Sequence, residues 1–204
     1  MNVVLLMTAA MLGFLAFFEP CTIATHTLFA ARLGHETVRR RSFALTLLVL
    51  SRTSLLMAIF GMAAWIGLDG FPTNIAMLLL GVIGAIYLLS RRIYLPIPHI
   101  EFFRLIPSHG RMPQALKLGL TLPACTLPLV VVVGIISALS QQTDMAMLAG
   151  LALATMFSLP TLWNSTHELD AAQRALLGKA ASLSPYITTL LLWGGAFLIW
   201  NTGA

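Results

Sequence analysis

The chain has 204 residues, of which 58% are hydrophobic and 9% are charged. In soluble domains about a quarter of the residues are charged, so this composition excludes an ordinary soluble protein and indicates a membrane protein. The net charge of +5 does not point to nucleic acid, because the positive side chains gather in loops between apolar segments.

Six apolar stretches are long enough to cross a bilayer, whose hydrocarbon core takes about 20 residues of helix. They cover residues 2–18, 43–68, 72–90, 118–140, 145–163 and 183–200. No positive residue precedes the first stretch, which favours a retained span over a secretory signal peptide. The sequence therefore predicts an all-α integral membrane protein with six transmembrane helices in the lipid bilayer.

The positive residues predict how these spans are oriented. Eleven of the twelve Lys and Arg residues lie in three loops, after the first, third and fifth spans. Because cytoplasmic loops carry the positive charge of a membrane protein, we expect these loops in the cytoplasm and both termini outside. The twelfth, Arg52, lies within the second span.

The two cysteines, Cys21 and Cys125, lie 104 residues apart in similar settings, FEPCTIAT and TLPACTLP. Each belongs to the first span of a set of three, and an odd number of spans inverts the second set relative to the first. We therefore expect two inverted three-helix repeats in a single transmembrane domain. The first half covers residues 1–95, a cytoplasmic linker covers 96–112, and the second half covers 113–204.

Prolines beside both cysteines predict that the first and fourth helices are broken there. Pro20 and Pro123 each lack an N–H, and such a residue costs a regular helix about 3 kcal/mol. Pro128 is compatible with the first turn of the restarted helix, and Thr22 and Thr126 are the expected N-caps of the two restarts. Because broken backbone survives in a membrane only against protein or water, both cysteines are expected to face the interior.

A cysteine at the start of a helix lies near the positive end of the helix dipole, which favours the reactive thiolate. Two such cysteines form a disulfide if their Cα atoms come within about 4.4–6.8 Å. A pair that cycles between dithiol and disulfide carries two electrons across the membrane by thiol–disulfide exchange, without a redox cofactor. Alternatively, both are buried as small hydrophobic side chains, although the matching motifs favour the redox interpretation.

These motifs resemble those of the CcdA family and of the transmembrane domain of the thiol-disulfide interchange protein DsbD, which carry one proline-cysteine motif in the first span and one in the fourth. The resemblance extends over essentially the full chain. It implies a membrane thiol–disulfide oxidoreductase of a prokaryotic plasma membrane. Such a protein takes electrons from cytoplasmic thioredoxin through a Cys21–Cys125 disulfide and passes them to extracytoplasmic thioredoxin-like proteins, in cytochrome c maturation or periplasmic thiol reduction. The chain departs from the family pattern at Glu19, where Ser is common, at Ala24, where a second proline is common, and in its second motif, Pro-Ala-Cys.

Glu19 and Arg52 are the formal charges expected well inside spans, where a lone charge costs about 2.5–3.5 kcal/mol. The two side chains form an ion pair, or Glu19 acts on the Cys21 thiol. Alternatively, Glu19 is simply protonated, or Arg52 snorkels to the cytoplasmic side. His26, about 140° around the helix from Cys21, is expected to point away from the thiol as an interfacial or hydrogen-bonded residue. Two isolated cysteines lack the spacing of metal ligands, so no metal site is expected.

The two longer of the predicted cytoplasmic loops contain further sequence patterns. The loop 91–117 holds four prolines and either links the two halves or docks thioredoxin. Ser165 and Glu168 match a capping box, which predicts a short surface helix with Leu169, Ala172 and Leu176 on one face.

A second interpretation stands beside the relay. Broken helices and inverted repeats are features of transporters in general. The two motifs would then bind a small solute or a soft metal ion, and the cysteines would only line that site.

Overall fold

The computed structural model describes residues 2–67, 73–90, 100–101, 113–123, 125–140, 142–166 and 171–202. These residues are almost entirely helical, with one two-stranded antiparallel sheet. The elements are α1 (Asn2–Phe17), α2 (Pro20–Gly34), α3 (Val38–Ile66), α4 (Thr73–Ser90), β1 (Ile100–Glu101), α5 (Gln114–Gly119), β2 (Thr121–Leu122), α6 (Leu127–Ser140), α7 (Thr143–Thr166) and α8 (Ala171–Thr202).

Two helices of the described residues are long and apolar enough to cross a membrane, Val38–Ile66 and Thr143–Trp163. The pair Leu5–Phe17 and Thr22–Gly34 meets the same criterion together, with a 70° bend between its members, which makes it a broken span or a re-entrant loop. Shorter apolar helices cover Met77–Ile86 and Leu127–Ser140. The prediction of an all-α membrane protein is confirmed.

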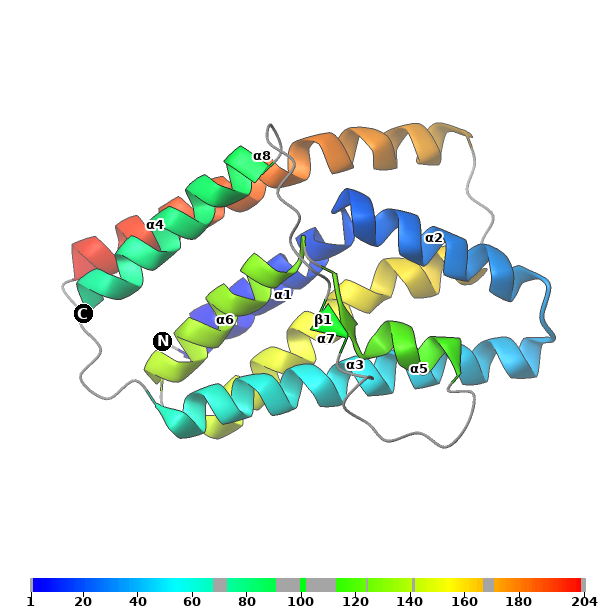
Figure 1. Ribbon diagram of the computed structural model, residues 1–204, viewed down its shortest axis with the longest axis horizontal. Coiled ribbons are helices and arrows are strands. Elements are labelled where there is room, and N and C mark those ends of the chain that lie inside the picture. The colour runs from blue at the N-terminus through cyan, green and yellow to red at the C-terminus, as the bar shows by residue number, and fades with distance from the viewer. Residues whose placement is uncertain are drawn as a thin grey trace.

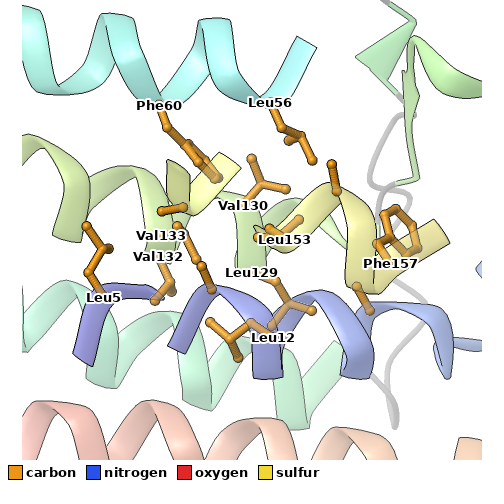
Figure 2. Close-up of a cluster of buried hydrophobic side chains, with 14 of the residues drawn as sticks. Leu5, Leu12, Leu56, Phe60, Leu129, Val130, Val132, Val133, Leu153 and Phe157 are labelled. Carbon is orange, nitrogen blue, oxygen red and sulfur yellow. The ribbon is translucent and has the colours of Figure 1, made fainter. Parts of the chain in front are cut away.

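The centre of the molecule is built from α1, α3, α6 and α7, while α4 pairs with α8 along one side (Figure 1). Figure 2 shows the buried apolar side chains that these four helices share, which include Leu5, Leu12, Leu56, Phe60, Leu129, Val130, Val132, Val133, Leu153 and Phe157. Close approach depends on small residues, as in other membrane helices. A Cβ on Gly150 of α7 would lie 2.8 Å from backbone atoms of Leu56 and Met57, so these two helices cross nearly backbone to backbone.

The first helix is interrupted within the FEPC motif. α1 ends at Phe17, and α2 begins at Pro20, where the missing N–H costs nothing because the first helical N–H groups have no partner in the helix. Glu19 has extended backbone angles (φ −66°, ψ 136°) and occupies the N-cap position. The prediction that Thr22 caps this helix is therefore wrong, because Pro20 fixes the helix start and leaves Thr22 inside the first turn.

The chain before Cys125 is interrupted in a different way. A half-helix was expected there, but α5 ends at Gly119 and the next residues form β2, with Leu122 opposite Ile100 and Thr121 opposite Glu101 in β1. A proline disfavours helical backbone angles in the residue that precedes it, and Pro123 follows Leu122 directly. The first part of the fourth predicted helix is thus a short helix followed by an extended segment.

The helix resumes two residues after Cys125. α6 begins at Leu127 with Pro128 as its second residue, in the first turn. Thr126 lies just before it, and its carbonyl accepts the first helical bond, from Val130 N–H at 3.1 Å. Its hydroxyl donates to the Pro123 carbonyl at 2.9 Å. Thr126 therefore stands at the expected cap position, but its side chain stabilises the preceding turn.

The expected short surface helix and the sixth span form one helix, α8, which has Pro185 inside it and changes direction along its length (Figure 1). Ser165 lies in the last turn of α7 and donates to the Leu162 carbonyl at 2.8 Å, so it does not cap the following helix. Glu168 of the predicted capping box and most of the loop 91–117 lie outside the described residues.

Candidate functional site

The two cysteine motifs meet inside the molecule. Thr22 follows Cys21 directly in α2, is fully buried, and places its Oγ1 3.9 Å from the Sγ of Cys125. The two residues are 103 positions apart in the chain. Segments that the sequence places in separate halves are therefore neighbours in space.

Both cysteines stand at the N-terminal end of a helix. Cys21 is the second residue of α2, and Cys125 lies in the turn before α6, where Thr126 N–H donates to the Pro123 carbonyl at 3.0 Å. Cys125 is half-buried and disulfide-bonded, and its Sγ faces the buried Thr22. The Cys21 side chain lies outside the described part of the structure, so its inward orientation stays a prediction.

Glu19 is buried at the break between α1 and α2, with 3% of its surface exposed. Its Oε1 accepts a hydrogen bond from Ser184 Oγ at 3.3 Å. The same hydroxyl lies 3.4 Å from the Leu15 carbonyl in the last turn of α1. This contact ties the first motif to α8.

Arg52, on α3, is fully buried and points into the bundle. Its Nη2 donates to His26 Nε2 at 3.1 Å and to the Leu118 carbonyl at 3.4 Å, and its Nη1 donates to Ser158 Oγ at 3.3 Å. The guanidinium carbon also lies 4.2 Å from the centre of the Phe157 ring, within range of a cation–π interaction. One side chain thus contacts α2, α5 and α7.

Glu19 and Arg52 do not form the ion pair that was one interpretation of their charges. Among the described residues, the ion pair is Glu36–Arg40 on the surface, at 3.5 Å. Snorkelling of Arg52 is also wrong, since neutral acceptors and an aromatic face surround its guanidinium in the interior. The interpretation that Glu19 acts on the Cys21 thiol stays a prediction.

His26 lies in the same cluster with 1% of its surface exposed. A guanidinium has no acceptor, so Arg52 donates and His26 Nε2 accepts. The ring is therefore neutral with its proton on Nδ1, which donates to Thr161 Oγ1 at 2.5 Å. The ring also stacks on Phe157, with centroids 5.5 Å apart. A hydrogen-bonded histidine is confirmed.

The pairing of Arg52 with His26 is the part of the site that the sequence alone did not indicate. Ser158 and Thr161 on α7 are three residues apart and so share one face of that helix. A polar face on an otherwise apolar span was a signal that this helix has polar partners. Which partners they are depends on how the helices pack.

No family model matches this chain, and no curated protein or solved structure matches it either. Within the described ranges, no group of three or more His, Cys, Asp or Glu side chains is arranged to hold a metal ion. The function is therefore argued from the chain's own residues.

Proposed function

We propose that the protein is a membrane thiol–disulfide oxidoreductase that relays electrons through a reversible Cys21–Cys125 disulfide. Its reductant is cytoplasmic thioredoxin, and its acceptors are extracytoplasmic thioredoxin-like proteins. The proposal rests on the contact between the motifs, where Thr22 Oγ1 lies 3.9 Å from the Sγ of the disulfide-bonded Cys125. The chain holds one other cysteine, so Cys21 is the partner that a single chain offers.

The reaction is two successive thiol–disulfide exchanges. A thioredoxin thiolate attacks one sulfur of the pair and forms a mixed disulfide, while the other cysteine leaves as a thiolate. The second thioredoxin thiol then attacks the mixed disulfide and releases the first cysteine. Thioredoxin departs as a disulfide and the pair is left as a dithiol, so two electrons and two protons have moved. The dithiol reduces the acceptor's disulfide by the same steps in reverse.

The backbone positions of both cysteines support this chemistry. A helix N-terminus carries a partial positive charge and stabilises an anion placed beside it. A thiolate is both the attacking and the leaving form in each exchange, so lowering its free energy assists both steps. Exchange needs no redox cofactor beyond the cysteine pair.

We infer that the chain forms six spans in a prokaryotic plasma membrane, as two inverted three-helix halves (1–95 and 113–204) with both termini outside. In support, the start of α1 and the end of α8 lie at one end of the molecule, and the turn between α2 and α3 lies at the other (Figure 1). That turn is flanked by basic residues, as a cytoplasmic loop would be: Arg32, Arg39, Arg40 and Arg41.

Trapping the mixed disulfide tests the relay. Cys21→Ala and Cys125→Ala are each incubated with a thioredoxin that retains only its attacking cysteine, activated beforehand as a mixed disulfide with thionitrobenzoate. The thiolate that remains in the variant attacks the thioredoxin sulfur, and thionitrobenzoate leaves. We expect a covalent adduct, resistant to denaturant but not to reductant, with the one variant that keeps the cysteine that thioredoxin attacks in the relay. The double variant is the control and forms none. If neither single variant forms an adduct, and alkylation of the parent shows no redox-linked mobility change, the relay is refuted and a non-redox transporter of a small solute or soft metal ion takes its place.

A further inference from the structure

Arg52 joins the two segments that carry the cysteine motifs. Its Nη2 donates both to His26 Nε2 and to the Leu118 carbonyl. His26 belongs to α2, which begins with the Cys21 motif. Leu118 belongs to α5, which leads through β2 to the turn that contains Cys125. A single nitrogen atom on a third helix therefore connects elements from both halves of the chain.

Close packing next to this contact holds the Leu118 carbonyl in place. A Cβ on Gly119 would collide with the Ser51 hydroxyl and lie 2.9 Å from the Leu48 carbonyl oxygen. Gly119 adjoins Leu118, and Ser51 adjoins Arg52. α5 therefore rests on α3 at the point where the guanidinium meets the Leu118 carbonyl.

His26 is also held in place in this bridge, by which we mean the two hydrogen bonds from Arg52 Nη2 to His26 and to the Leu118 carbonyl. Thr161 on α7 accepts from His26 Nδ1, and Phe157 stacks on the ring. The Arg52 guanidinium is fully buried, so losing an acceptor would leave a polar group in the interior without compensation. The bridge therefore resists separation of α2 from α5.

We propose that Arg52 is a positioning residue for the cysteine pair, which holds α2 and the α5–β2 segment together and thereby sets the reduction potential of the Cys21–Cys125 disulfide. This inference rests on the proposed relay. Arg52 is fully buried, and its hydrogen bonds go to His26, Ser158 and the Leu118 carbonyl rather than to a sulfur atom. It acts on the equilibrium because a contact that favours the approach of two thiols raises their effective concentration and so favours the disulfide over the dithiol.

The potential is measured on the full chain in detergent micelles, equilibrated in dithiothreitol or glutathione buffers and then alkylated, with the shifted fraction read on a gel. Arg52→Met removes the donors and keeps a side chain of similar length. We expect a loss of about tenfold in the equilibrium constant for the disulfide, a shift of about 30 mV to a less negative potential. Ser158→Ala is the matched control, because it removes a bond from the same guanidinium to α7 and leaves the bridge between the motifs. Its equilibrium constant should stay within about twofold of the parent's.

A second pair of variants covers the case in which Arg52→Met does not fold. His26→Leu removes the acceptor of the bridge, whereas His26→Gln places an amide oxygen near the position of Nε2. We expect the shift with leucine and its partial reversal with glutamine. Phe60→Leu, which alters the buried core on α3, controls for lost stability and should leave the potential unchanged.

The positioning role is overturned if folded Arg52→Met and His26→Leu both keep an equilibrium constant for the disulfide within about twofold of the parent's. An equal shift in Phe60→Leu would also overturn it. Small thiols report the potential without thioredoxin, so failure of the relay is distinguishable from failure of the positioning role. If only the relay fails, Arg52→Met still shifts the potential, whereas neither Cys21→Ala nor Cys125→Ala forms an adduct with thioredoxin.

Discussion

Gly119 offers a quantitative test of how α5 is seated on α3. In Gly119→Ala, the new methyl group would meet the Ser51 hydroxyl, with the Leu48 carbonyl oxygen at 2.9 Å and the Ser51 Cβ at 3.0 Å. Overpacking of this kind costs typically about 1–3 kcal/mol, because neighbours leave their preferred positions. The Leu48 carbonyl belongs to a helix backbone and can shift less easily than a side chain. We therefore expect the free energy of unfolding of Gly119→Ala to be about 2 kcal/mol below the parent's.

The structure also predicts how far a second substitution relieves this strain. Ser51→Ala removes the hydroxyl that the methyl group would strike, but it leaves the Leu48 carbonyl and the Cβ in place. The double variant Gly119→Ala/Ser51→Ala should therefore recover about 1 kcal/mol, within the range seen for residues in direct contact. Full recovery is not expected, because two close contacts remain.

The assay is reversible unfolding in mixed micelles of increasing denaturing detergent, followed by the far-ultraviolet circular dichroism of the helices. Gly134→Ala on α6 is the control, since a Cβ there meets nothing within 4 Å. A glycine inside a helix is less stable than alanine by about 0.5–1 kcal/mol, so this variant should gain stability. If Gly119→Ala is as stable as Gly134→Ala, or if Ser51→Ala gives no recovery, the packing described between α5 and α3 is incorrect.

Three further substitutions test other parts of the site. Glu19→Gln should shift the pH profile of Cys21 alkylation, because the buried carboxylate can no longer take a proton; an unchanged profile removes that role. Phe157→Ala should lower the free energy of unfolding by about 3–5 kcal/mol in the same detergent titration, because the ring is 1% exposed, whereas Leu159→Ala, at 53% exposure, should change it little. Thr161→Val should cost about 1–3 kcal/mol by leaving the histidine Nδ1–H without its acceptor, and stability equal to the parent's would contradict the hydrogen bond between His26 and Thr161.

Features that depend on neighbouring residues could be predicted from the sequence. The interruption at Pro20 follows from its missing N–H and fixed φ, and the long apolar runs around residues 43–68 and 145–163 predict the two helices that could cross a membrane. A hydrogen bond of His26 follows from the rule that a polar side chain within an apolar segment finds a partner, whereas its burial and the identity of its partners come from the structure.

Features that depend on distant residues could not be predicted. β2 forms because Thr121 and Leu122 pair with β1, which lies about twenty residues earlier in the chain. Local helix propensity carries no information about such a distant partner. Opposite charge favours Glu19 as a partner of Arg52, and side-chain length favours the membrane surface. Its actual acceptors are a neutral imidazole, a hydroxyl and a carbonyl, brought together by the packing of α2, α5 and α7.

The engagement of both His26 ring nitrogens has a consequence for ion leakage. Nε2 accepts from Arg52 and Nδ1 donates to Thr161, so the ring has no lone pair to offer a hydronium ion or a water molecule. Proton hopping through this part of the interior would require the ring to break its bond to Arg52 first. For the relay proposed above, a histidine ring with both nitrogens engaged is favourable, because a transmembrane proton gradient would then not be dissipated through this polar cluster.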